Sequence, residues 1–226
     1  DEDPDALPRD RQAQLAEQHQ ATVTALYVAK PKADQSMVDF AADILRKQVR
    51  EHVGAVQATC EVVAGSPSAE IVFEADHRQA DLIVVGAHGR HWPRDLLVGS
   101  TAESVVREGP CPVLVVNRPT EAAYSTVLLA VDDSPQARLA AQAGILLTSE
   151  EAHYVLAHSE LVIGEHLMRM RGADEKTIES LRAVQLAEAK RQMEGIAAEL
   201  GVSPEVLVES GRPEERIPEL AHRCEA

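Results

Sequence analysis

Three glycines and two hydroxyl residues near the middle of the chain have the types and the spacing to bind a phosphate group. Gly86 and Gly89 are separated by two residues, and nine more lead to Gly99, which Ser100 and Thr101 follow. Glycine lets the backbone approach a ligand without a Cβ atom in the way, and the start of a helix offers unpaired N–H donors to an anion. The spacing fits neither a Walker loop nor a dinucleotide fingerprint. From the glycines alone, a plain strand-to-helix connection is the alternative.

The segments on either side indicate which elements must position these residues. The apolar run 82–85 precedes the glycines and Val113–Val116 follows them, and both are typical of parallel strands that are buried on two faces. Residues 99–108 between them have a helical pattern, which Pro110 and Pro112 end. The predicted order is therefore strand, glycine loop, helix and strand.

The pattern Gly86-x2-Gly89-x9-Gly99-Ser100, with DLIVVG before it and CPVLVV after it, resembles the nucleotide loop of the universal stress protein family. The resemblance implies a flavodoxin-like (adenine nucleotide alpha hydrolase-like) α/β fold with a parallel five-stranded sheet. It also implies that ATP, with or without Mg²⁺, lies over the ends of the strands. Because the family contains members that do not bind ATP, a chain of this type can equally act without nucleotide.

The resemblance also implies a set of contact residues. The glycines and the serine contact phosphate, and Arg90 either pairs with a γ-phosphate or is simply solvated. Asp1 corresponds to an acidic residue that holds adenosine, or it is a frayed end. Val28 corresponds to a position whose backbone meets adenine, although core packing is an equal reading. The predicted nucleotide-binding residues are Asp1, Val28, Gly86, His88, Gly89, Arg90, Gly99, Ser100 and Thr101.

Other reactive side chains show no pattern of their own. The segment from Asp132 to Pro135 is interpreted as a helix cap, although Asp132 repeats the acidic position of Asp1. His91 has no partners at metal-ligand spacing, and Cys111 between two prolines is interpreted as structural. We therefore predict no catalytic residue and no metal site. Without a recognisable general base, the chain is at most a slow ATPase.

The composition limits the partners of the protein. The 226 residues include 22 Lys and Arg against 37 Asp and Glu, a net charge of −15 that repels nucleic acids and anionic membranes. The three cysteines at 60, 111 and 224 show no metal spacing and cannot all pair, which favours a reducing compartment. With no long apolar run and no signal peptide in the sequence, we expect a soluble cytoplasmic protein that binds neither nucleic acid nor membrane.

The rest of the chain alternates strand and helix patterns, which indicates parallel sheets covered by helices. A short linker at 118–125 divides it into two predicted universal stress protein domains, 1–118 with the nucleotide loop and 124–226 without one. The predicted strands are 21–30, 55–64, 82–85, 113–116, 126–131, 152–159 and 205–209. The predicted helices are 9–19, 34–53, 67–79, 99–108, 132–148, 174–200 and 213–224.

The two halves repeat one another. Gly65-Ser66-Pro67-x3-Ile71 matches Gly211-Arg212-Pro213-x3-Ile217 at an offset of 146, whereas Ala21 matches Ala152 at an offset of 131. The second copy has therefore gained 15 residues between its second and third strands. The recurrence of the same element order favours gene duplication.

Compared with the family pattern, each copy is incomplete, which suggests a tandem protein truncated at both ends. The first copy lacks an opening strand, and the second lacks the nucleotide loop and the last strand. The apolar segment Val113–Val116 would then leave an open sheet edge. We expect this edge to form a homodimer, or to be covered within an intramolecular pseudo-dimer.

The sequence therefore predicts an ATP-binding regulatory protein of the stress response. The alternative is a stress adaptor or interaction module that does not bind nucleotide. The protein partner and the stress signal have no signature in the sequence.

Overall fold

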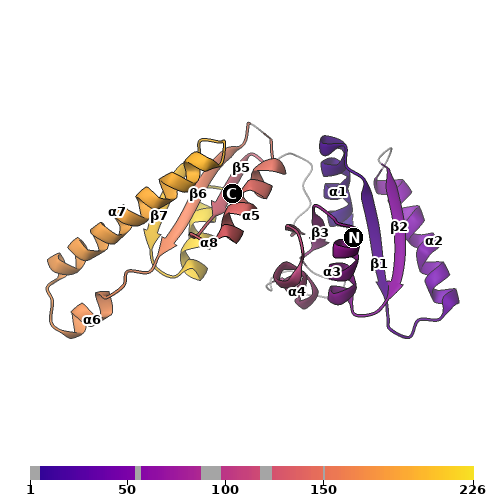
Figure 1. The fold of residues 1–226 in the computed structure, drawn as a ribbon, viewed down its shortest axis with the longest axis horizontal. Coiled ribbons are helices and arrows are strands. Elements are labelled where there is room, and N and C mark those ends of the chain that lie inside the picture. Colours follow the sequence, from indigo (N-terminus) through magenta and orange to yellow (C-terminus); the bar gives the residue numbers. More distant parts are fainter. Residues whose placement is uncertain (1–5, 54–56, 88–97, 118–123, 150) are drawn as a thin grey trace. The chain divides into compact units, whose positions relative to one another are not determined.

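The computed structural model describes residues 6–53, 57–87, 98–117, 124–149 and 151–226. The chain divides into two compact units, residues 1–121 and 122–226. Both have an α/β architecture with parallel strands, as the alternating sequence pattern predicts (Figure 1). Among the described residues, no helix has both the length and the apolar character that crossing a membrane requires.

The first unit contains two pairs of parallel strands. β1 pairs with β2 from Val23 opposite Ala58 to Ala29 opposite Ala64, and β3 pairs with β4 from Ile83 opposite Val113. The elements of this unit are α1 (Ala6–His19), β1 (Val23–Ala29), α2 (Gln35–His52), β2 (Ala58–Ala64), α3 (Pro67–His77), β3 (Ile83–Gly86), α4 (Ser100–Glu108) and β4 (Val113–Val116).

Helices cover both pairs. Ala16 of α1 and Val53, the residue after α2, form a cluster with Val23, whereas α3 and α4 pack Ala75 and Val105 against β3. α1 also contacts β3 and β4. The expected five-stranded sheet is thus represented by two strand pairs, and no strand among the described residues joins β1 to β3.

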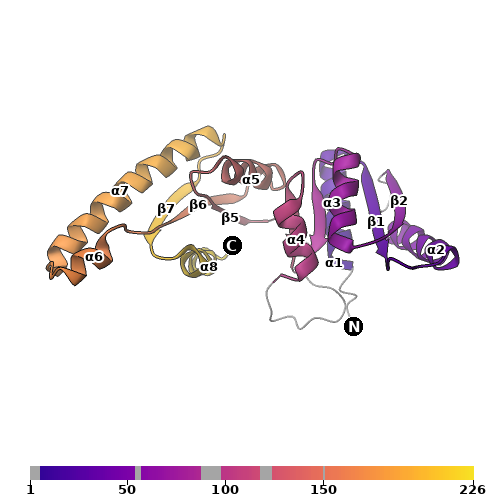
Figure 2. The same cartoon turned by 60° about the horizontal axis from the view of Figure 1, so that its bottom comes forward.

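The second unit contains one parallel sheet with the order β5-β6-β7. Its elements are β5 (Thr126–Ala130), α5 (Pro135–Leu146), β6 (His153–Glu160), α6 (Glu165–Met170), α7 (Glu175–Glu199), β7 (Glu205–Ser210) and α8 (Pro213–Arg223). Tyr154 and Leu156 pack with Met193 and Ile196 of α7, and α8 contacts β6 as well. Figure 2 shows α7 and α8 on opposite sides of this sheet. Met193 and Ile196 are both buried, so α7 presents an apolar face to this sheet.

The apolar face of α2 is only partly buried. Leu45 is buried and Val49 packs against the core of the first unit, whereas Met37 and Ile44 are exposed and Phe40 is 69% exposed. A two-stranded layer is narrower than the apolar face of an 18-residue helix, and it covers only the part that lies directly above it.

A short helix, α6, was not predicted. Asp34 accepts a hydrogen bond at the start of α2 and Asp174 does so at the start of α7, but they lie 5 and 14 residues after Ala29 and Glu160 respectively. Nine of the extra residues of the second copy therefore lie between β6 and α7, where α6 forms. α7 has 25 residues and α2 has 18, and this difference of seven covers the remaining six.

Candidate nucleotide site and related positions

The end of β3 and the start of α4 are joined by backbone hydrogen bonds. Buried Ala87, the residue after β3, donates its N–H to the carbonyl of Val116 at 2.9 Å. Its own carbonyl accepts from the N–H of Gly99 at 2.8 Å. Ala87 thus connects the end of β4 to the start of α4. This places Gly86 and Gly99, two of the predicted phosphate-binding glycines, at one corner of the first unit.

The start of α4 presents free backbone donors. Gly99 is the N-cap residue with φ −64° and ψ 153°, and as a glycine it offers no side chain that could cap the helix. At the start of α4, the N–H of Glu103 donates to the carbonyl of Gly99 at 3.0 Å. The N–H groups of Ser100 and Thr101 have no acceptor among the described residues, and both residues are exposed. Such a terminus carries a partial positive charge and attracts anions.

Buried residues on the inner face fix the position of α4. Ala102 and Val105 are buried, and Val105 contacts the cluster that contains Ala75 and Ile83. Glu103 in the first turn would oppose an incoming anion, but it pairs with Arg107 at 3.0 Å. The helix therefore holds its free amides in a defined place while its acidic side chain is partly neutralised.

The predicted residues fall into three groups. Gly86, Gly99, Ser100 and Thr101 lie together at the corner between β3 and α4. Val28 lies in the other strand pair, opposite Val63 and half-buried, as its core-packing reading predicts. The remaining four, Asp1, His88, Gly89 and Arg90, lie outside the described residues.

In the second unit, the position of Asp1 is repeated at Asp132, which is part of a helix cap as predicted. One of its carboxylate oxygens accepts from the N–H of Ser134 at 2.9 Å and from the Ser134 hydroxyl. These two donors hold the pKa of Asp132 below its ordinary value. Ser134 in turn accepts from the N–H of Ala137 at 3.1 Å and caps α5.

The position of Val28 is repeated at Ser159, 131 residues later. Its hydroxyl is buried and donates to the carbonyl of Gly211 at 2.9 Å. The neighbouring His158 places Nδ1 2.8 Å from the carbonyl of Val131 and Nε2 3.1 Å from a carboxylate oxygen of Glu160. Because a carbonyl only accepts, Nδ1 carries the proton. This polar cluster was missed from the sequence, because the residue pattern within β6 gives no signal for contacts with other strands.

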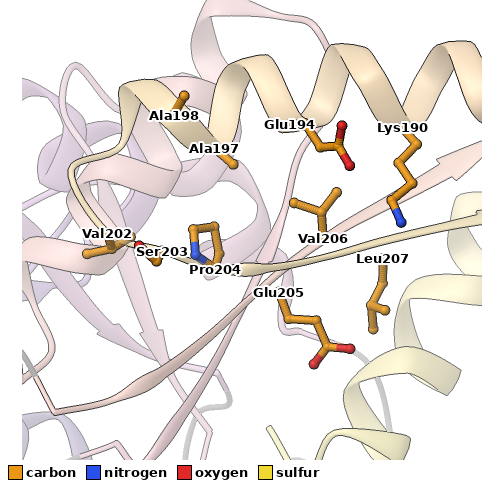
Figure 3. Close-up of a pocket in the computed structure, with 10 residues that line it drawn as sticks. All are labelled: Lys190, Glu194, Ala197, Ala198, Val202, Ser203, Pro204, Glu205, Val206 and Leu207. Atoms are coloured by element: carbon orange, nitrogen blue, oxygen red, sulfur yellow. The ribbon is translucent and has the colours of Figure 1, made fainter.

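A groove of about 620 Å³ lies along the edge of the second unit, between α7 and the start of β7 (Figure 3). Val206 and Ala197 supply apolar wall, and Lys190 and Glu194 project from α7 beside them. Glu205 lies 3.8 Å from His153. The groove is thus a shallow surface feature between α7 and the edge strand β7. No group of three His, Cys, Asp or Glu side chains that could hold a metal occurs in the part of the chain that the structure describes.

Comparison with known proteins agrees with this fold. Residues 9–117 match the model of the universal stress protein family. A universal stress protein of Methanocaldococcus jannaschii is 42% identical over 73 residues, which cover 32% of this chain and 42% of that protein. A second one from the same organism is 40% identical over 57 residues, covering 25% and 35%. The chain thus spans less than half the length of these two curated relatives.

Solved structures extend the similarity to both units. A universal stress protein from Archaeoglobus fulgidus DSM 4304 aligns with 98% of this chain and 79% of its own, at 17% identity and a TM-score of 0.64. This alignment shows a shared fold. Residues 9–117 thus match the universal stress protein family, and the chain shares the fold of a solved member of that family.

Proposed function

We propose that the first unit binds ATP and that the protein is a nucleotide-binding regulator of the stress response. One observation carries the proposal. The hydrogen bond from Gly99 N–H to Ala87 C=O places the uncapped start of α4 beside the end of β3. Gly99 belongs to the motif Gly86-x2-Gly89-x9-Gly99-Ser100, which lies within the segment that matches the universal stress protein family.

In the proposed complex, the free N–H groups and hydroxyls of Ser100 and Thr101 bind the phosphates. Gly86 and Gly99 allow the backbone to approach them closely. We assign Gly89 to the same phosphate contacts, and His88 and Arg90 to the outer phosphates. The Val28 backbone and Asp1 are assigned to contacts with the adenosine. The phosphates would bind with or without Mg²⁺.

The test is calorimetric titration of the full chain with ATP, comparing Gly99→Val with wild type. The backbone angles of Gly99 are accessible to valine, so this substitution forces no left-handed strain. The branched side chain of valine would nevertheless block the close approach of the phosphate to the backbone, so ATP binding should no longer be measurable. Gly195→Val is the matched control, because Gly195 lies in α7 and a Cβ there meets no atom within 4 Å.

Two results would contradict the proposal in different ways. Equal ATP affinity in Gly99→Val and wild type would show that the phosphates do not bind at the start of α4. A folded wild-type chain that gives no heat with ATP would favour the adaptor function instead.

We also propose that the protein associates as a homodimer through β4. Among the described residues β4 pairs only with β3, so its other edge has no strand partner. Pairing two copies would satisfy these backbone groups and bury apolar side chains, each worth about 1.5 kcal/mol or more. The intramolecular pseudo-dimer is the competing arrangement.

A further inference from the structure

We propose that the second unit has a separate binding site for a small organic anion, a monocarboxylate with an apolar tail. The site is a cavity of about 420 Å³ at the carboxyl ends of β6 and β7. Its location follows the general rule that ligands of parallel α/β sheets bind beyond the carboxyl ends of the strands. The inference does not depend on nucleotide binding by the first unit.

The lining of the cavity combines apolar and cationic groups. Leu161 and Val162, which follow β6, supply the apolar part, and Ser210 lies at the end of β7. Arg169 of α6 and Arg182 of α7 supply two guanidinium groups. The volume lies in the range of small-molecule sites and admits a compact ligand only.

The charged groups that line the cavity indicate the charge of the ligand. Against the two guanidinium groups, the lining contains one carboxylate, Glu165, which lies 2.7 Å from Arg182 and 3.2 Å from Arg169. His166 is the remaining titratable group of the lining, and Glu175 pairs with Arg169 at 2.9 Å from α7. Arg182 has no other ion-pair partner in the described part of the chain, so the attraction it offers suits a single negative charge.

One donor at this site is unsatisfied. Arg182 uses Nη2 for its bond to Glu165, whereas its Nε is buried and has no hydrogen-bond partner among the described residues. A buried donor without an acceptor destabilises the protein. A carboxylate in the cavity would instead pair with the charge of the Arg182 guanidinium group, whose only hydrogen bond to a described residue runs from Nη2 to Glu165.

The walls are held in place without a ligand. Gln185 of α7 donates its side-chain N–H to the carbonyl of Ile163 at 3.0 Å and accepts from the N–H of Ile163 at 2.9 Å. Together with the ion pairs of Glu165 and Arg169, this clamp fixes α6 on α7. A site that is already ordered loses less entropy on binding.

The first unit has no counterpart to this arrangement. Only four residues separate the end of β1 at Ala29 from Asp34, so no segment equivalent to α6 exists there. The added segment between β6 and α7 therefore gives the second unit a function of its own.

The test is calorimetric titration of the full chain with hexanoate at low salt. Hexanoate should bind saturably, whereas hexanamide, which has the same tail and no charge, should not. Arg182→Gln should weaken hexanoate binding about tenfold or more, the loss expected when a charged hydrogen bond is removed. Arg191→Gln on the exposed side of the same helix is the matched control and should bind as wild type does.

A second variant guards against loss of structure in Arg182→Gln. Val162→Phe keeps every charged group and fills the apolar part of the cavity, so it should also abolish hexanoate binding. Gly99→Val should leave it unchanged, which separates this site from the nucleotide site. Absence of saturable hexanoate binding, equal binding of hexanamide, or wild-type affinity in folded Arg182→Gln would each overturn the proposal.

Discussion

The backbone N–H of Gly211 donates a 3.1 Å hydrogen bond to the carbonyl of Glu160, across the carboxyl ends of β7 and β6. The first unit contains the same bond, from Gly65 to Ala29 at 3.0 Å. The two glycines are 146 positions apart and the two acceptors 131, which are the offsets of the sequence repeat. The repeat therefore extends to an individual hydrogen bond.

The two glycines should nevertheless respond differently to substitution. Gly211 has φ +143°, and a Cβ would lie 2.8 Å from Nε of Arg216. At Gly65 no such backbone angle occurs, and the Cβ would meet the flexible end of Glu70. We predict that Gly211→Ala lowers the free energy of unfolding by about 1–3 kcal/mol. Gly65→Ala should lower the free energy of unfolding by less, as measured by urea titration of both variants. The reverse order would show that the positive φ of Gly211 does not determine the cost of substitution.

The cap of α5 should control the titration of Asp132. Ser134→Ala removes the hydroxyl donor, so the pKa of Asp132 should rise toward its ordinary value. It also removes the acceptor for Ala137 N–H, which should destabilise the protein by about 1 kcal/mol. Because the folded pKa is depressed, the Asp132 contribution is present above the unfolded pKa and lost as pH falls through the folded value. The variant should therefore lose less stability in acid.

Ser36→Ala is the matched control for the titration experiment. Ser36 donates to Asp34 at 2.8 Å and the pKa of Asp34 is likewise lowered, but Asp34 itself accepts from Met37 N–H. NMR titration should show the pKa of Asp34 rising in Ser36→Ala, with the α2 cap retained. Unchanged carboxyl shifts in both serine variants would show that the hydroxyls do not set these pKa values.

Two leucines of the second unit should differ sharply. Leu156 in β6 is fully buried, whereas Leu139 in α5 is 62% exposed. Leu156→Ala should reduce the free energy of unfolding by about 2–5 kcal/mol, the cost of a cavity in a packed core. Leu139→Ala should change it by less than about 0.5 kcal/mol. Equal effects in calorimetric unfolding would show that β6 is not the centre of the core.

The proposed dimer predicts a selective effect of proline in β4. Ile83 N–H donates to Pro112 and Ala87 N–H to Val116, so even-numbered residues of β4 face β3. The N–H of Val115 then points to the open edge. Val115→Pro should halve the mass measured by light scattering while leaving the β3–β4 pairing intact. A wild-type mass near 24.5 kDa at micromolar concentration would exclude the homodimer.

Local pattern predicted much of this fold. Val113–Val116 forms a strand as its β-branched run indicates, and the buried face of α7 follows its apolar spacing. The N-cap at Gly99 was likewise predictable, because glycine followed by two hydroxyl residues favours a helix start.

What escaped prediction depends on contacts between distant residues. α6 is six residues long, leaves Leu167 exposed, and is held by Arg182, 17 positions after Glu165. The bond between Ala87 and Gly99 depends on how the strand end and the helix meet, which no periodicity encodes. The exposure of Phe40 follows from the width of the strand layer, a property of the whole unit.

The central strand β6 has a consequence for how this sequence can change over time. Val155, Leu156 and Ala157 are consecutive and fully buried, because helices cover both faces of the strand. A strand with one wet face can vary at every second position, but here adjacent positions are all constrained. Polar replacements should be rejected at each of the three, so an alignment of close descendants would show an unbroken apolar block where other strands show alternation.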